Sequence, residues 1–295
     1  MKLASFDDYR VGVMSDAGLV DVTDLLPAFL AELPAQRINW LITHWHELRE
    51  QIGDRVRHGT ALDPNGVRLL PANPGASQLF AAPANYRKHI GELKERAVTS
   101  GGRSAREQGF FLKAVASLTG SGTVLRLPRN SQRRFDHESE LAVVIGREAR
   151  NVPRERAMEY VFGYSCLIDA TMRIEKGVGE EERTMRKSFD TFTPLGPYLV
   201  TADEVGDASE LSNRLWVNDV LKQEANTRDM IVDIPELIEM VSSVLTLRPG
   251  DIIATGTPEG VGQMSPGDTV TMEIERVGRL SVKVAENEAV SPRAY

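Results

Sequence analysis

The strongest constraint on the fold comes from the segment Phe135–Gly146, which reads Phe-Asp-His-Glu-Ser-Glu-Leu-Ala-Val-Val-Ile-Gly. Its second half, Leu141–Ile145, is a continuous apolar run, which is typical of a strand buried on both faces. Residues two apart on a strand point to the same side, so Glu138 and Glu140 project together from the beginning of that strand. Two buried carboxylates without partners repel each other and are costly to desolvate. Any fold of this chain must therefore bring positive charge to them.

Two sources of that charge fit the sequence. A third acidic residue, Asp169, ends the apolar strand Tyr164–Ile168, and three carboxylates suit a hard ion such as Mg²⁺, Mn²⁺ or Ca²⁺ better than zinc. In the alternative, the two glutamates lie on an edge strand and form ion pairs with arginines. The spacing alone leaves both possibilities open. The candidate arginines are Arg133, Arg134 and Arg173.

The rest of the chain predicts an α+β protein with a mixed β core. Helical patterns are few and are separated by several strands, which argues against a doubly wound sheet. The predicted strands are Lys2–Phe6, Val11–Met14, Leu19–Val22, Leu141–Ile145, Tyr164–Ile168, Asp251–Thr255 and a closing hairpin of Thr269–Glu275 with Leu280–Val284; the predicted helices are Arg37–Ile52, Pro153–Phe162 and Pro235–Leu247.

Two loop-rich stretches mark possible boundaries. The first contains Pro64-Asn65-Gly66 and Pro71-Ala72-Asn73-Pro74-Gly75, and it predicts a small β-rich N-terminal domain of residues 1–75 before a larger domain of residues 76–295. The second, Ser100–Glu107, is polar and glycine-rich. It fits either a surface loop or the hinge of a mobile lid.

Composition narrows the class of protein. The 295 residues carry a formal net charge of −7, which argues against nucleic acid as the main partner. The single cysteine, Cys166, cannot form an internal disulfide, and this favours a reducing compartment. No run approaches the ~20 apolar residues of a membrane helix, and the first residues lack a signal-peptide pattern. We expect a cytoplasmic protein that does not enter a membrane.

Five segments between residues 85 and 262 occur in a characteristic order: Asn85–Glu92 (Asn-Tyr-Arg-Lys-His-Ile-Gly-Glu), Asp136–Gly146, Phe162–Asp169, Lys187–Pro197 (Lys-Ser-Phe-Asp-Thr-Phe-Thr-Pro-Leu-Gly-Pro) and Asp251–Gly262 (Asp-Ile-Ile-Ala-Thr-Gly-Thr-Pro-Glu-Gly-Val-Gly). Together they resemble the motifs of the fumarylacetoacetate hydrolase family, whose members include acylpyruvases and 2-hydroxyhepta-2,4-diene-1,7-dioate isomerases. The resemblance covers more than half of the chain. It implies a mixed β roll and a homodimer.

The resemblance also implies a role for individual residues. Glu138, Glu140 and Asp169 would be the metal ligands, His89 and Glu92 a dyad on a lid helix, and Lys187 a contact to a substrate carboxylate or oxyanion. The substrate would be a small 2,4-dioxo or 2-oxo carboxylate, and the metal Mg²⁺ or Mn²⁺, with Ca²⁺ possible in crystals. Further substrate-binding residues would be Tyr86, Arg173, Gly256 and Thr257.

One segment departs from the family pattern. After Asp169 the family's hydrolases often read Ser-Ala-Arg-Asp-x-Gln, whereas this chain keeps Arg173 but has Ile174 and Lys176 at the next two characteristic positions. Substrate specificity therefore cannot be transferred. A lysine at position 176 suggests an anionic substrate such as a dicarboxylate, and we include Lys176 among the candidate binding residues.

The family chemistry predicts a hydrolase acting on carbon–carbon bonds in ketonic substances. A metal ion would stabilise an enolate, and His89, oriented by Glu92, would activate water. An isomerase, a tautomerase or a decarboxylase acting on a hydroxymuconate-like or oxaloacetate-like acid would use the same metal but no nucleophilic water. A third possibility is a catalytically silent scaffold or sensor, against which the paired His89 and Glu92 argue.

Overall fold

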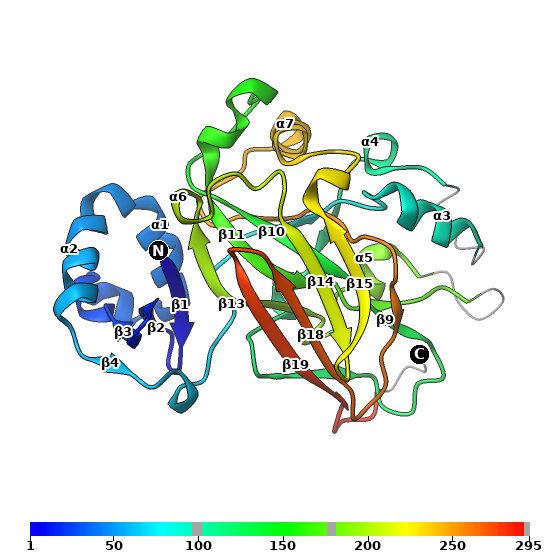
Figure 1. Cartoon of the computed structure of the whole chain (residues 1–295), viewed down its shortest axis with the longest axis horizontal. Helices are drawn as coiled ribbons and strands as arrows, with labels where there is room; N and C mark the ends of the chain where they lie inside the picture. The colour runs from blue at the N-terminus through cyan, green and yellow to red at the C-terminus, as the bar shows by residue number, and fades with distance from the viewer. Residues whose placement is uncertain (96–101, 176–180, 292–295) are drawn as a thin grey trace.

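The computed structural model of the protein describes residues 1–95, 102–175 and 181–291, and it is built mainly of strands (Figure 1). The predicted α+β class is confirmed. The large sheet has the order β4-β3-β2-β1-β13-β11-β10-β16-β5-β6, with β7 paired to β13. Its strands are β1 (Lys2–Phe6), β2 (Arg10–Ser15), β3 (Gly18–Asp21), β4 (Ala61–Leu62), β5 (Leu79–Ala81), β6 (Phe111–Lys113), β7 (Leu118–Thr119), β10 (Ser139–Ile145), β11 (Val161–Ile168), β13 (Thr193–Thr201) and β16 (Ile252–Ala254).

Two smaller sheets complete the β structure. One has the order β15-β14-β18-β19-β8 and the other β12-β9-β17. Figure 1 shows strands β14, β15, β18 and β19 lying side by side in front of β10 and β11. The bounds are β8 (Val124–Leu127), β14 (Ser212–Val217), β15 (Val220–Asn226), β18 (Thr269–Ile274), β19 (Gly278–Glu286), β9 (Phe135–His137), β12 (Thr171–Met172) and β17 (Gly262–Gln263). The predicted closing hairpin is confirmed as β18 and β19, which pair antiparallel.

Strand β10 lies inside the large sheet, between β11 and β16, and both of its faces are buried. Leu141, Val143 and Ile145 belong to the core between the sheets, whereas Ala142 and Val144 belong to a second core on the opposite face. This explains the continuous apolar run, because neither face of the strand meets water. The edge-strand part of the alternative is therefore wrong, whereas the ion pair that it predicted between Glu138 and Arg173 is present.

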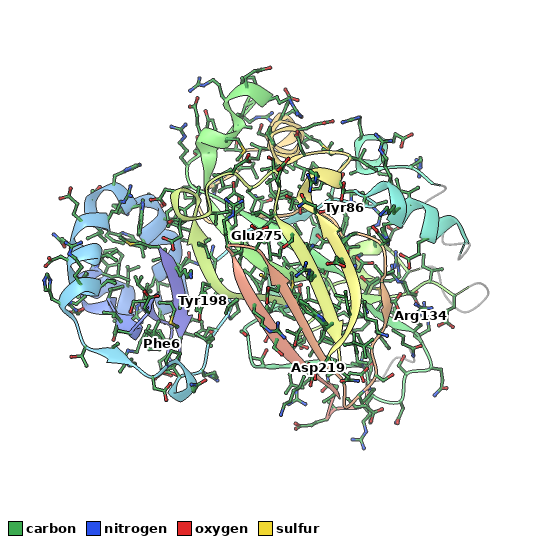
Figure 2. The ribbon with its side chains drawn as sticks, viewed as in Figure 1. Phe6, Tyr86, Arg134, Tyr198, Asp219 and Glu275 are labelled. Carbon is green, nitrogen blue, oxygen red and sulfur yellow. The ribbon has the colours of Figure 1, made fainter. Side chains whose placement is uncertain are left out.

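The N-terminal residues extend the large sheet. Strand β1 pairs antiparallel with β13, with Lys2 opposite Val200 and Leu3 opposite Leu199. Figure 2 shows Phe6 and Tyr198 near this junction, and Tyr198 packs against the small cluster that contains Phe6. The division at residue 75 stays a prediction about folding units; the two parts share a sheet and a core.

The helices are α1 (Arg37–Thr43), α2 (Trp45–His58), α3 (Arg87–Glu95), α4 (Ala105–Gln108), α5 (Arg183–Arg186), α6 (Ala202–Val205) and α7 (Ile234–Val244). The last confirms the helix predicted at Pro235–Leu247 within a few residues. By contrast, the prediction of one helix over Arg37–Ile52 is wrong, because His44 has a non-helical backbone and divides it. The His44 ring stacks on Trp40 with centroids 3.9 Å apart, which fixes the break.

A second helix prediction is also corrected. Residues Arg154–Tyr160 form a 3-10 helix, and Phe162 lies in strand β11. Ala157 is the buried residue of this turn, so it lacks the apolar stripe that would favour a longer α-helix. Within Ser100–Glu107, the described part ends in helix α4, which begins with a capping box formed by Ser104 and Glu107. Each described helix is too short or too polar to cross a membrane.

Gly163 allows the close approach of the central strands. It lies in β11 opposite Val144 of β10 and Thr201 of β13. A Cβ atom at this position would stand 2.1 Å from the Val200 carbonyl oxygen. The neighbouring atom belongs to the backbone of a sheet strand, so it cannot move aside cheaply.

We expect Gly163→Ala to lower the free energy of unfolding by about 2 kcal/mol or more, because the β11–β13 pairing must open. Urea denaturation monitored by circular dichroism measures this change. Gly66→Ala is the matched control, since a Cβ there meets no atom within 4 Å. Equal stabilities of the two variants would contradict this explanation.

Candidate active site

Three carboxylates converge because β10 and β11 pair antiparallel. Ser139 lies opposite Ile168 and Glu140 opposite Leu167. Continuing that register brings Glu138 opposite Asp169, whose backbone N–H donates to the Glu138 carbonyl at 2.8 Å. The three side chains are buried, and one oxygen from each lies within 4.8 Å of the others.

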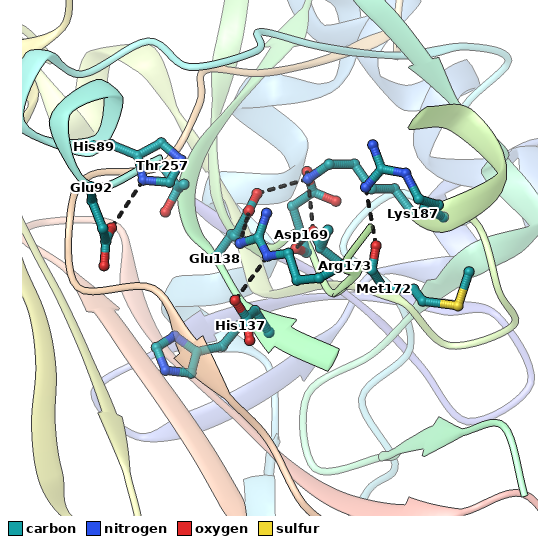
Figure 3. A network of polar contacts seen from close by, with 12 residues as sticks. His89, Glu92, His137, Glu138, Asp169, Met172, Arg173, Lys187 and Thr257 are labelled. Atoms are coloured by element: carbon teal, nitrogen blue, oxygen red, sulfur yellow. Dashed lines mark hydrogen bonds and ion pairs between the residues drawn. The ribbon is translucent and has the colours of Figure 1, made fainter. Parts of the chain in front are cut away.

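Lys187, which follows α5, supplies charge to two of the carboxylates. Its Nζ donates to Glu138 Oε2 at 2.7 Å, to Asp169 Oδ2 at 2.5 Å and to Thr171 Oγ1 at 2.7 Å (Figure 3). These three bonds use all the donors of an ammonium group. Lys187 therefore acts on this site through its charge, and a direct hydrogen bond to a ligand requires one of these bonds to be given up.

Arg173 connects the cluster to a fourth carboxylate. Its guanidinium donates to Glu138 Oε1 at 2.6 Å and to Asp136 Oδ2 at 2.8 Å, and Arg134 also donates to Asp136. Burial opposes ionisation of Glu138, but the attraction of Lys187 and Arg173 outweighs it and holds the pKa of that carboxyl below its usual range. The third candidate, Arg133, pairs instead with Glu181.

Glu140 has a different set of polar partners from Glu138 and Asp169. Within the described residues it accepts one hydrogen bond, from the Gly256 backbone N–H at 2.8 Å, and it has no lysine or arginine at ion-pair distance. Burial and then the charge of Asp169 raise the pKa of its carboxyl. A buried carboxylate in this position is stabilised by a cation that reaches all three acids.

The loop that follows β16 brings Gly256 to this position. Gly256 has a φ of +92°, and a Cβ there would stand 2.6 Å from the Asn85 Cβ. Asn85 holds the neighbouring loop in place through hydrogen bonds from its Nδ2 to Thr255 O and Val232 O, each 2.8 Å long. Because only glycine tolerates both the φ and the close approach, this position is tightly constrained.

Helix α3, which begins directly after Asn85 and Tyr86, carries the predicted dyad. The His89 Nδ1 lies 3.2 Å from Glu92 Oε2, as expected for residues three apart on a helix. Figure 3 shows these two residues on one side of Glu138 and Lys187 on the other. A Glu92 carboxylate that accepts from Nδ1–H leaves the His89 Nε2 as the basic nitrogen.

Most of these side chains line a single cleft. Its lining combines acidic and basic side chains with one histidine. The lining residues are Ala82, Pro83, Ala84, His89, Phe111, Glu138, Glu140, Asp169, Arg173, Arg183, Arg186, Lys187 and Thr257.

Residues 78–285 match the family model of the fumarylacetoacetate (FAA) hydrolase C-terminal domain. The chain belongs to the fumarylacetoacetate hydrolase family. The resemblance found in the sequence motifs is thereby confirmed, and so is the expected fold.

Proteins named as hydrolases and proteins named as isomerases are both similar to this chain. The chain is 44% identical to a maleylpyruvate hydrolase of Aquipseudomonas alcaligenes, over 96% of this chain and 99% of the relative. A crystal structure of maleylpyruvate hydrolase from Sphingobium sp. SYK-6 in complex with manganese(II) and pyruvate is 39% identical, covers 98% of this chain and 100% of its own, and superposes with a TM-score of 0.85. A 5-carboxymethyl-2-hydroxymuconate delta-isomerase from Mycobacterium smegmatis is 35% identical over 78% of this chain and 84% of its own, with a TM-score of 0.66.

Two of the residues expected to bind substrate lie differently from that expectation, and one lies outside the described part of the chain. Tyr86 is buried, forms a β-bridge with Met230 and does not line the cleft, so its placement gives no support to a binding role. The Gly256 N–H is engaged by Glu140. Lys176 falls outside the described residues. Arg173 and Thr257 do line the cleft.

Thr257 is oriented by a residue that motif reasoning missed. Gln223, on β15, donates from Nε2 to Thr257 Oγ1 at 2.9 Å, and its Oε1 accepts from Ser139 N and lies 3.1 Å from His137 Nδ1. The Thr257 hydroxyl in turn donates its single proton to the Pro258 carbonyl at 3.5 Å, a long bond that it would exchange for one to a ligand in the cleft. His137 is itself buried.

Lys113 is the second residue that the motifs missed. It ends β6, is buried, and donates to Asp169 Oδ1 and, at 3.2 Å, to the Phe192 carbonyl. Burial lowers the pKa of this lysine despite the attraction of Asp169. In the sequence, Lys113 follows an apolar run and has no acidic neighbour that would have drawn attention to it.

We expect Lys113→Met to lower the free energy of unfolding by about 3 to 5 kcal/mol in the presence of EDTA, because the variant leaves Asp169 with one cation fewer in a buried site. Urea denaturation measures the change. Lys222→Met, at an exposed position of β15, is the control and is expected to stay within about 0.5 kcal/mol of wild type. A stability like that of the control would show that Lys113 does not neutralise Asp169.

Proposed function

We propose that this protein is a hydrolase acting on a carbon–carbon bond of an acylpyruvate, and that it releases pyruvate and a carboxylic acid. The observation that supports this most directly is the buried Glu138–Glu140–Asp169 cluster facing His89 across one cleft. The maleylpyruvate hydrolases found among its relatives point to the same reaction.

We further propose that Glu138, Glu140 and Asp169 hold a divalent cation, Mg²⁺ or Mn²⁺. The side chains fit such an ion: they offer only oxygen, their ligand atoms lie within 4.8 Å of one another, and Glu140 has no other cationic partner among the described residues. When bound, the ion supplies a Lewis acid that stabilises negative charge on a chelating 2,4-dioxo group.

The charges around the cluster favour a dianionic ligand at this end of the cleft. Four carboxylates are faced by four cations, so the protein alone is close to neutral here. A divalent ion adds two positive charges, and the enolate form of a 2,4-dioxo acid brings two negative ones. The carboxylates are Asp136, Glu138, Glu140 and Asp169, and the cations are Lys113, Arg134, Arg173 and Lys187.

In the proposed reaction, His89 takes a proton from water and Glu92 stabilises the resulting imidazolium. The oxygen of that water forms a bond to the C4 carbonyl carbon, and the bond between C3 and C4 then breaks. Its electron pair remains on C3, which becomes the enolate of pyruvate and finally accepts a proton. The charge of Lys187 and the hydroxyl donor of Thr257 stabilise negative charge as it develops.

Isomerisation or decarboxylation is the second candidate, because structures named as isomerases are also among the relatives. Neither reaction needs a nucleophilic water. The His89–Glu92 pair, with Nδ1 and Oε2 3.2 Å apart, favours hydrolysis, since activation of water is the task that this arrangement suits.

The cytoplasmic location and the homodimer stay proposals as well. They are supported by the single buried cysteine and by the family resemblance. Burial raises the pKa of the Cys166 thiol to about 12, which fits a core residue rather than a reactive one.

We expect the protein to remove the diketone absorbance of acylpyruvates in the presence of Mn²⁺ or Mg²⁺ and to release one pyruvate per substrate, measured with lactate dehydrogenase. EDTA should abolish turnover, and added Mn²⁺ should restore it. Glu138→Gln should lose both the metal and the activity. Absorbance lost without pyruvate would identify an isomerase, and full activity in EDTA would refute the metal proposal.

We expect His89→Ala to slow turnover by ~10²–10⁴-fold, because general base catalysis contributes about that factor. Bound manganese, measured by elemental analysis, should stay at the wild-type level because His89 is not a proposed ligand. His46→Ala, at an exposed position of α2, is the control. A wild-type rate in the His89 variant would remove this residue from the mechanism.

A further inference from the structure

Two arginines in the cleft have no carboxylate partner in the part of the chain that the structure describes. Arg183 and Arg186 both line the cleft, yet neither forms an ion pair there. The other two basic residues of the lining are already neutralised, Arg173 by Asp136 and Glu138, and Lys187 by Glu138 and Asp169. The unbalanced positive charge is thus confined to helix α5.

Neutral groups hold both guanidinium groups in place. Arg186 donates from Nε to the Glu181 carbonyl at 2.9 Å and from Nη1 to the Met172 carbonyl at 3.0 Å. Its Nη2 makes no hydrogen bond to a described residue. Such contacts fix the position of a cation without cancelling its charge.

Arg183 is held by residues of α4 and β6. Its Nη2 donates to Gln108 Oε1 at 2.8 Å, and its guanidinium lies 5.2 Å from the centre of the Phe111 ring. Arg183 and Arg186 are three residues apart on one helical turn, which brings their side chains to the same face. The pair forms a prearranged cationic site.

Both cations are held in an unfavourable environment. Burial, followed by repulsion from Arg173 and Arg183, lowers the pKa of Arg186 to about 10, and burial also lowers the pKa of Arg183. Attraction from Glu138 and Asp169 opposes these effects without cancelling them, so each guanidinium group gains from the arrival of an anion. Planar guanidinium groups match a carboxylate particularly well, because they can donate two parallel hydrogen bonds.

We propose that Arg183 and Arg186 bind a second carboxylate at the far end of the acyl arm, so that the preferred substrate is a dicarboxylic acylpyruvate. This inference rests on the proposed hydrolysis of acylpyruvates. The dioxo end of the substrate already balances the divalent cation at Glu138, Glu140 and Asp169. The positive charge of Arg183 and Arg186 is not balanced by this end of the substrate. A second carboxylate, such as the one that maleylpyruvate carries, would balance it.

The test compares maleylpyruvate, which carries the second carboxylate, with acetylpyruvate, which ends in a methyl group. Steady-state kinetics with Mn²⁺ should show that wild type prefers maleylpyruvate in kcat/KM by at least about tenfold. Arg183→Met should reduce kcat/KM for maleylpyruvate by about 10- to 100-fold, mainly through KM, because a hydrogen bond to a charged group is lost. The loss on acetylpyruvate should be much smaller.

Three further variants complete the test. Arg183→Lys should retain part of the preference, since it keeps the charge but loses the planar donors. Arg186→Met should behave like Arg183→Met, and residual cleavage of acetylpyruvate reports that this buried position still permits folding. Arg214→Met, whose exposed side chain pairs with Glu224 on the outside of β14, is the control.

Several outcomes would overturn the inference. Equal losses on both substrates would place the arginines at the pyruvyl end, and unchanged kinetics would give them no binding role. A wild-type enzyme that cleaves both substrates equally well would also overturn it, even if no arginine variant folds. Release of pyruvate from neither substrate would instead defeat the proposed hydrolysis itself.

Discussion

The pairing of β10 with β11 forces Glu138, Glu140 and Asp169 together in a place where all three are almost wholly buried. Most polar contacts of the site reduce the repulsion among these three buried carboxylates. Lysines arrive from β6 and from the residue after α5, arginines from beside β9 and β12, and a backbone N–H from the loop after β16. The arrangement neutralises most of the acidic charge and leaves Glu140 as the carboxylate that a metal ion would complete.

Local periodicity explains why the sequence predicted the acidic residues and not all of their partners. Glu138 and Glu140 are two apart on a strand, and Asp169 ends the next apolar run, so their relation is visible in short windows. Lys113 lies 56 residues from Asp169, and Gln223 lies 34 residues from Thr257. Those contacts depend on strand order across the sheets, which no local pattern specifies.

The fold shows the same division between local and distant information. The hairpin of β18 and β19 follows from alternation and a turn, and the sequence located it well. The pairing of β1 with β13 joins residues about 200 positions apart. Likewise, the apolar stripe over Arg37–Ile52 continues through His44, whose backbone leaves the helix because its ring stacks on Trp40. Periodicity reports which face is buried; it does not report where a helix is interrupted.

The site divides into two parts with different structural origins. The acidic end is built on paired central strands, where a change of position would disturb two cores at once. Arg183 and Arg186 stand instead on the single turn of α5 and are held by two backbone carbonyls and one amide. Lys187, the residue that follows Arg186, donates to Glu138 and Asp169. The turn therefore carries both the proposed site for the acyl arm and a cation that the carboxylate cluster depends on, so a change in the turn is felt at both ends of the cleft.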